Sequence, residues 1–217
     1  MNRIFDMNNG FFRGLSKLVD CIYLSVLFVF SSIPIFTIGA SLTALYYTIQ
    51  KTIKNDRGYV GKEYWAAWRS NFKQSTLIWL INLLMLIVLY GDIQILKVLE
   101  EGGNPLGKTY VFFWVMLVLL LLWISYLYPY IARFENTTKA ILKNAAYMAI
   151  LNLPRTLLIG LLMLVFGLAI YLVPITILIV PAVYTWLKNY NLEKVFRKYM
   201  SEEDIAAEEE LNREYKN

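Results

Sequence analysis

The chain has 217 residues, of which 58% are hydrophobic and 17% are charged, and its formal net charge is +5. Ordinary soluble domains have about 45–50% apolar and about 25% charged residues, so this composition indicates a membrane protein. The chain contains no histidine, which excludes imidazole metal ligands and every catalytic dyad or triad that uses histidine. Its single cysteine, Cys21, excludes an intrachain disulfide and a CxxC site.

Four long stretches of the sequence lack Asp, Glu, Lys and Arg. They comprise residues 21–50, 74–91, 109–132 and 156–187, and contain 30, 18, 24 and 32 residues. About 20 apolar residues cross a hydrocarbon core of about 30 Å as a helix. The two middle stretches therefore predict one membrane span each, whereas the two outer stretches are too long for one.

Each outer stretch is interrupted by a proline, Pro34 in the first and Pro174 in the last. Because proline lacks a backbone donor and disfavours helix at the preceding residue, we predict two tight helical hairpins. In the first hairpin, a helix that starts near Phe11 leads to the turn, and Thr37 caps a returning helix over residues 38–54. The alternative is that Pro34 only kinks one long, tilted helix. We do not expect a cleavable signal peptide, because the apolar segment continues past the proline.

The distribution of Lys and Arg predicts the topology, because short cytoplasmic loops collect these residues. Residues 1–20, 51–73, 133–155 and 188–217 carry three, six, four and six of them, and residues 92–108 carry two. Six spans with both termini cytoplasmic place 19 cations inside and 2 outside. A five-span alternative with the N-terminus outside places 16 inside and 5 outside. We therefore predict an all-α polytopic transmembrane helical bundle, with six spans preferred and five as the alternative.

Two of the cytoplasmic segments show the pattern of amphipathic helices at the membrane interface. In residues 62–73, aromatic side chains share one helical face and cations lie off that face, as in helices that rest on lipid. Residues 138–151 repeat the pattern more weakly, with Asn136 or Thr137 available as a cap. The alternative is that both segments are juxtamembrane ends of spans. The predicted membrane-interface residues are Trp65, Trp68, Lys62, Arg69 and Lys73.

We expect residues 1–200 to form a single transmembrane helical domain and residues 201–217 to form an acidic cytoplasmic tail. The tail contains seven acidic residues against Arg213 and Lys216, and has almost no apolar face. This composition favours a solvated helix that aids solubility, and a docking peptide is the alternative.

The sequence contains no GxxxxGK[ST], GxGxxG or HExxH motif. We therefore expect no enzyme, no catalytic residues, no cofactor and no metal site. No ionisable residue lies inside a predicted span, and Lys17 and Asp20, three residues apart at the start of the first span, are expected to form a surface ion pair.

Small and polar residues within the spans predict helix packing. Asn82 lies in the middle of the third span, where an amide must find a partner, so we predict an interhelical hydrogen bond. Gly39, Gly160 and Gly167 are expected to let neighbouring helices approach closely.

Three stretches together resemble the YesL-like family of small bacterial integral membrane proteins. They are SSIPIFTIGASLTALYYTIQK, YWAAWRSNFKQSTLIWLI and YLYPYIARFENTTKAILKNAAYMAILNLPRTLLI. The residues that carry the resemblance are Pro34, Thr37, Gly39, Asn71, Phe72, Lys73, Pro129, Arg133, Phe134, Asn152, Leu153 and Pro154. The resemblance implies a multi-pass protein of the bacterial plasma membrane, in a family whose activity is not established. Its members often accompany genes of carbohydrate-uptake ABC transporters, and no catalytic or binding residues come with the family.

Two functional hypotheses follow from the sequence. The first is a non-enzymatic accessory component associated with carbohydrate uptake, with the lipid bilayer and ABC-type sugar permease subunits as partners and no nucleic acid. The alternative is a small transporter or substrate-binding membrane module that acts as a homo-oligomer. The absence of charges from the spans favours the accessory component. Neutral sugars bind amides, hydroxyls and aromatic rings, so the candidate ligand or helix-packing residues are Asn82, Trp79, Trp123 and Tyr126.

Overall fold

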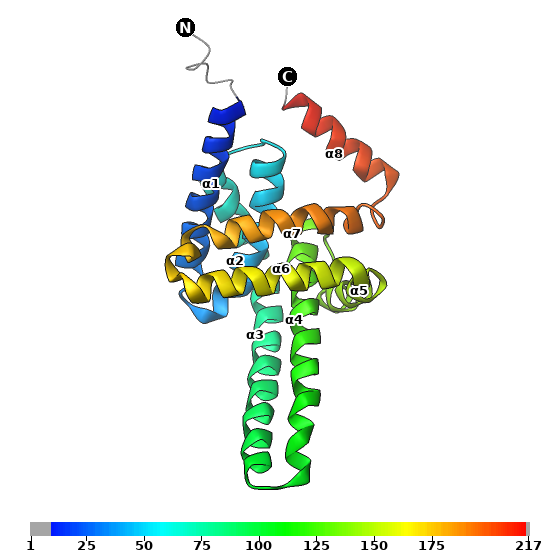
Figure 1. Ribbon diagram of the computed structural model, residues 1–217. Helices are drawn as coiled ribbons and strands as arrows, with labels where there is room; N and C mark the ends of the chain where they lie inside the picture. Colours follow the sequence, from blue (N-terminus) through cyan, green and yellow to red (C-terminus); the bar gives the residue numbers. More distant parts are fainter. Residues whose placement is uncertain (1–9, 216–217) are drawn as a thin grey trace.

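The computed structural model describes residues 10–215 of the chain, which are all-α (Figure 1). The predicted cytoplasmic position of the N-terminus falls on residues 1–9, which lie outside this range. The last two residues of the acidic tail also lie outside it. The elements are α1 (Gly10–Ser31), η1 (Ile35–Thr37), α2 (Ile38–Thr48), η2 (Ile49–Lys54), α3 (Val60–Glu101), η3 (Pro105–Thr109), α4 (Tyr110–Arg133), α5 (Thr138–Leu151), α6 (Leu153–Leu172), η4 (Pro174–Leu178), α7 (Val180–Phe196) and α8 (Glu202–Glu214).

The chain reverses direction at Pro34 and again at Pro174. Helix α1 ends at Ser31, and the chain returns through η1 into α2, which continues as the π-helical turn η2 to Lys54. Helix α6 ends at Leu172, and η4 begins at Pro174 and leads into α7. Each proline therefore ends a helix, and Pro34 does not merely kink one.

The predicted capping role of Thr37 is wrong. Its hydroxyl makes no capping bond to α2 and donates instead to the carbonyl oxygens of Ser31 and Pro34, each at 2.6 Å. The physical reason is that Thr37 already has helical backbone angles (φ −91°, ψ −5°), which an N-cap residue normally lacks. The hydroxyl therefore closes the turn by bonding to the carbonyl at the end of α1 and to that of Pro34.

Helices α3 and α4 form a hairpin that extends well beyond the rest of the molecule (Figure 1). Helix α3 has 42 residues and is therefore about 63 Å long at 1.5 Å per residue. Residues 62–73 are its first turns, so they continue into the span and do not form a separate in-plane helix. At the tip, Gly103 has a positive φ of 81° and the Asn104 side chain accepts a hydrogen bond from the Leu106 amide.

Within residues 10–215, four helical segments are long and apolar enough to cross a membrane, which indicates a multi-pass membrane protein. They are Gly14–Ser31, Val60–Glu101, Pro105–Arg133 and Leu153–Leu172. Six parallel spans are not what the structure shows, because α6 and α7 run across the α3–α4 hairpin (Figure 1). Helix α7 is also short, with 17 residues.

Close packing of α2 against α3 depends on Gly39. A Cβ atom at this position would lie 2.4 Å from the backbone oxygen of Ser75 and 2.7 Å from Cβ of Trp79. The predicted close approach also holds at Gly160, where a Cβ would lie 2.7 Å from a terminal methyl of Leu122. It is wrong at Gly167, where a Cβ would meet nothing within 4 Å.

The predicted ion pair between Lys17 and Asp20 is also wrong. Lys17 Nζ lies 3.0 Å from Oδ1 of Asp56, in the turn that follows η2. Asp56 has a positive φ of 54°, and this turn brings its carboxylate beside α1. The structure thus uses Lys17 to hold the α2–α3 connection against the first helix.

Candidate functional site

A partly buried cluster of charged side chains is centred on Arg133, the last residue of α4. Its Nη2 atom lies 2.8 Å from Oε2 of Glu208 on α8 and 3.1 Å from Oε2 of Glu193 on α7. The Arg133 side chain is only 14% exposed. One guanidinium group therefore links three helices that are far apart in the sequence.

Glu193 is the most buried carboxylate of this cluster, with 3% of the residue exposed. The Tyr46 hydroxyl donates to its Oε1 at 2.8 Å, so α2 joins the same cluster. Burial raises the pKa of the Glu193 carboxyl above its ordinary value, and the nearby Arg133 charge and the Tyr46 hydrogen bond only partly oppose this. Arg133 and Tyr46 thus favour the anionic form of this buried carboxyl.

Glu208 brings the acidic C-terminal helix onto the cluster. Its Oε1 accepts from Nε2 of Gln50 at 3.2 Å, in addition to the contacts with Arg133. Burial raises the pKa of the Glu208 carboxyl, but the hydrogen bond and charge of Arg133 outweigh this and hold the pKa below the ordinary 4.5. The tail is thus docked on the body through Glu208. The sequence analysis favoured a solvated tail and did not predict this contact.

The lowered pKa of Glu208 predicts how α8 responds to acid. A carboxyl with a lowered folded-state pKa contributes stability above its unfolded value of 4.5, and this is lost as the pH falls through the folded-state value. We expect α8 to remain docked at neutral pH and to detach only below pH 4.5. Hydrogen exchange of the α8 amides across this range measures the transition. In Glu208→Gln, which lacks this titrating group, protection should be low already at neutral pH, and wild-type protection that stays constant below pH 4.5 would contradict the assignment.

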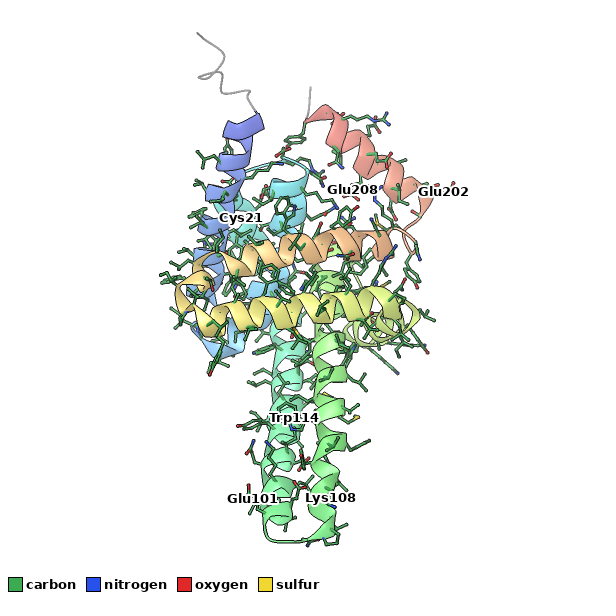
Figure 2. All side chains as sticks on the ribbon, in the orientation of Figure 1. Cys21, Glu101, Lys108, Trp114, Glu202 and Glu208 are labelled. Atoms are coloured by element: carbon green, nitrogen blue, oxygen red, sulfur yellow. The ribbon has the colours of Figure 1, made fainter. Side chains whose placement is uncertain are left out.

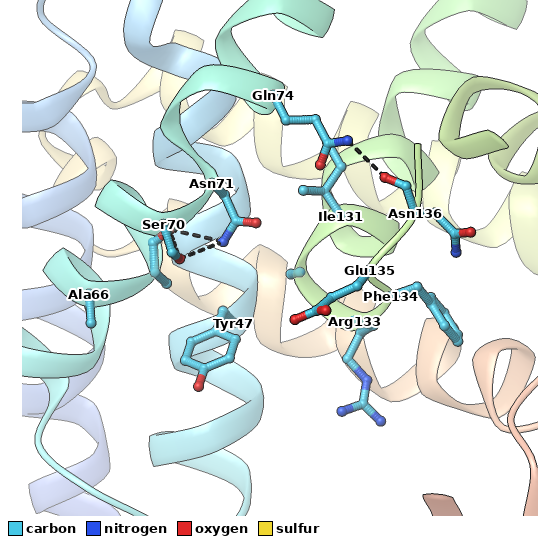
Figure 3. Close-up of a pocket in the computed structure, with 12 residues that line it drawn as sticks. Tyr47, Ala66, Ser70, Asn71, Gln74, Ile131, Arg133, Phe134, Glu135 and Asn136 are labelled. Carbon is cyan, nitrogen blue, oxygen red and sulfur yellow. Dashed lines mark hydrogen bonds between the residues drawn. The ribbon is translucent and has the colours of Figure 1, made fainter. Parts of the chain in front are cut away.

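A polar pocket of about 620 Å³ opens beside this cluster (Figure 3). It lies between α2, the first half of α3 and the connection from α4 to α5, where Gln74 Nε2 donates to the Asn136 carbonyl at 2.8 Å. Its lining residues are Tyr47, Ala66, Ala67, Ser70, Asn71, Gln74, Ile131, Ala132, Arg133, Phe134, Glu135 and Asn136. Amides, hydroxyls and one carboxylate can hydrogen-bond a polar, hydroxylated ligand in such a pocket.

The four candidate ligand or helix-packing residues already have partners within the protein. The indole nitrogens of Trp79 and Trp123 donate to the carbonyls of Ile35 (2.6 Å) and Leu142 (3.2 Å). The Tyr126 hydroxyl pairs with that of Thr156 at 2.8 Å, and Asn82 Nδ2 donates to the Tyr128 hydroxyl at 3.1 Å. None of the four lines the polar pocket.

The hydrogen bond of Asn82 predicts a small effect of its removal. Interhelical bonds of this kind average about 0.6 kcal/mol, and Asn82 Oδ1 is buried without a partner, so Asn82→Leu should change stability by less than about 1 kcal/mol. The melting temperature in detergent measures the change. A loss of several kcal/mol would show that Asn82 holds more of the fold than this bond, and Thr185→Val is a second buried polar-to-apolar change for comparison.

The predicted membrane-interface residues divide into two sets. Lys62, Arg69 and Lys73 are exposed, whereas Trp65 and Trp68 are half-buried against the core between α1, α2 and α3. The ring of Trp65 packs edge-on against that of Trp68, with centroids 5.6 Å apart. The contact of these residues with anionic lipid stays a prediction.

Sequence reasoning assigned Arg133, Glu193 and Glu208 to cytoplasmic segments, with Glu208 in a solvated tail, and so missed the cluster. A signal was present in α7, where Asn189, Leu192, Glu193 and Phe196 recur at the spacing of one buried helical face. All four are buried in the structure. A carboxylate inside such a face requires a cation, but the sequence does not say which one.

Comparison with known proteins identifies one related family. Residues 21–93 match the family described as "Protein of unknown function, DUF624". This family comprises YesL/YteU-like membrane proteins of unknown function, and the match covers about a third of the chain, from α1 into the apolar half of α3. The match agrees with the resemblance seen in the sequence. No curated protein and no solved structure matches the chain.

Proposed function

We propose that the protein is a non-enzymatic accessory component of a carbohydrate-uptake system, anchored in the bacterial plasma membrane by the α3–α4 hairpin. The observation that supports this proposal is the separation of the molecule into two parts. The outer half of the hairpin exposes large apolar side chains on both helices, whereas the polar pocket and the Arg133 cluster lie in the body. An anchored body of this kind is suited to holding or regulating a partner in the membrane.

The length of the hairpin fits one bilayer. From Gln74 to Gly91, the charge-free part of α3 rises about 26 Å, which is close to a hydrocarbon core of about 30 Å. Glu101 and Lys108 lie at the tip (Figure 2), and the connecting residues 92–108 carry only two of the 21 cations. By the positive-inside rule, we place the tip outside and the body with both termini in the cytoplasm. Helices α6 and α7 then lie along the inner face of the membrane.

The surface proposed for the permease is a groove of about 490 Å³ along the hairpin. It is lined by Leu84, Met85, Val88, Leu89, Met116, Leu119, Leu120 and Trp123. Within the hydrocarbon core, a transmembrane helix can fill such a groove by close packing of side chains. The permease itself is inferred from the family resemblance, whose members often accompany carbohydrate-uptake genes.

Affinity purification in a mild detergent tests this function. We expect sugar-permease subunits to co-purify with the wild type, and Val88→Trp, which fills the groove, to reduce their yield several-fold. Ile87→Trp is the matched control. Ile87 directly precedes Val88 in α3 and is similarly exposed, but it lies outside the groove. If no permease subunit co-purifies, or if both variants retain it equally, the proposal is wrong.

The polar pocket favours a second candidate, a substrate-binding membrane module that acts as a homo-oligomer. Its amide and hydroxyl groups suit a sugar better than the four residues chosen from the sequence, which already have protein partners. A sugar panel that raises the melting temperature of the wild type but not of Asn71→Leu would favour this function. Phe72→Leu on the same helix, outside the pocket lining, is the control.

A further inference from the structure

Helix α8 is attached to the body mainly through two carboxylates. Glu208 contacts Arg133 and Gln50, and the exposed Glu209 lies 3.4 Å from Nη1 of Arg197. The helix leans away from the rest of the molecule in Figure 1. No residue of α8 is fully buried. Only a few polar contacts therefore oppose its release.

A cavity of about 430 Å³ lies between α8 and the body. Its lining includes Arg57, Arg133, Glu135, Asp204 and Glu208. Arg133 thus contributes to this cavity and also to the polar pocket. The Nε atom of Arg133 is buried and has no hydrogen-bond partner. Its guanidinium therefore retains an unused donor.

The Glu208 carboxylate accepts three hydrogen bonds in this place. They come from Nη2 of Arg133 at 2.8 Å, Nη1 of Arg133 at 3.4 Å and Nε2 of Gln50 at 3.2 Å. A guanidinium fork with an additional amide donor also suits the oxygens of a phosphate group. Glu208 accordingly occupies the position that the anion of a ligand would take.

The charges around this position favour an anion once Glu208 has left. Arg57 and Arg133 line the cavity. The positive charges of Lys54 on η2 and of Arg197 at the end of α7 also interact with the carboxylate of Glu208. Asp204 lies on α8 and leaves with Glu208, so the remaining acidic groups are Glu193 and Glu135. Among the described residues, four cations then face two carboxylates, and one of the two, Glu193, is already paired with Arg133 and Tyr46.

We propose that Arg133 and Gln50 form a binding site for a phosphate-bearing small molecule on the cytoplasmic side, and that Glu208 of α8 closes this site until the ligand displaces it. The ligand and α8 exclude each other, because one guanidinium edge cannot hold both anions. Ligand binding in the body is thereby converted into release of an acidic helix. This inference does not depend on the partner proposed above, so either can fail without the other.

Calorimetric titration with inorganic phosphate tests the site, in a maltoside detergent at constant ionic strength maintained with chloride. We expect Glu208→Gln to bind phosphate about tenfold more tightly than the wild type, because no charged hydrogen bond has to be broken first. Glu210→Gln is the matched control, since it removes the same charge from an exposed residue of α8 that forms no ion pair with the described residues, and it should bind like the wild type. Equal affinity of Glu208→Gln and wild type would overturn the proposal.

Two further measurements assign the site and the source of the phosphate. In the Glu208→Gln background, Arg133→Lys keeps the charge beside Glu193 but lacks the fork, and we expect it to weaken phosphate binding at least tenfold. Hydrogen exchange should show that phosphate reduces protection of the wild-type α8 amides. If α8 is released only in nanodiscs that contain phosphatidic acid, and not by inorganic phosphate, the ligand is a lipid headgroup and the proposal of a soluble ligand is wrong.

Discussion

Arg133→Leu is expected to reduce the free energy of unfolding by about 3–5 kcal/mol. The reason is that the substitution leaves Glu193, which is 3% exposed, without its cation in the interior of the body. The melting temperature in detergent at neutral pH measures the loss. The loss should shrink as the pH is lowered, because an unpaired buried carboxyl becomes neutral by taking up a proton.

Two comparisons isolate the buried pair as the cause. Arg197→Leu removes an exposed pair, in which the side chains are 47% and 46% exposed, and should cost at most about 1 kcal/mol. The double variant Arg133→Leu/Glu193→Leu should recover most of the loss, since an apolar pair replaces the uncompensated charge. If Arg133→Leu costs no more than Arg197→Leu, the buried cluster does not stabilise the fold.

Gly39→Ala is expected to destabilise the protein by about 1–3 kcal/mol, the usual cost of overpacking. The new methyl group would lie 2.4 Å from the backbone oxygen of Ser75, and a backbone atom within a helix cannot move aside as a side chain can. Helices α2 and α3 would have to separate. A fall in melting temperature measures the effect.

Gly167→Ala provides the matched control for this substitution. Its added methyl would meet nothing within 4 Å, and alanine favours helix over glycine by up to about 1 kcal/mol. We therefore expect Gly167→Ala to be neutral or stabilising. Equal loss in both variants would contradict the close approach at Gly39.

Local features of the fold could be predicted from the sequence because they depend on neighbouring residues. Both hairpin turns follow from Pro34 and Pro174, which cannot continue the preceding helix. Helix α5 has the expected bounds, and the Thr137 hydroxyl accepts from the Ala140 amide as its cap. The start of the first helix near Phe11 also agrees with the observed start at Gly10.

The arrangement of the helices could not be predicted in the same way. Hydropathy reports whether a segment such as α6 is long enough to cross a membrane, but not its direction relative to α4. The charge count assumed that every apolar stretch spans the bilayer as one of a set of parallel helices, whereas α6 and α7 run across the hairpin.

The Arg133 cluster escaped prediction because it depends on contacts between distant parts of the chain. Arg133 and Glu208 are 75 residues apart, and Tyr46 and Glu193 are 147 residues apart. Composition marks the tail as acidic but does not show that one of its seven carboxylates has a partner in the body. Only the fold brings α2, α4, α7 and α8 to one point.

Labelling of single cysteines in intact cells tests most directly that α3–α4 is the membrane anchor. In a Cys21→Ala background, a membrane-impermeant thiol reagent is applied to cysteines at Gly102 in the hairpin tip, Tyr59 in the α2–α3 connection and Ile175 in the α6–α7 turn. All three positions are exposed in the structure. We expect labelling at Gly102 alone, and labelling at Tyr59 only after permeabilisation. Labelling at both Gly102 and Ile175 from outside would establish that α6 and α7 cross the bilayer, and would contradict the two-helix anchor.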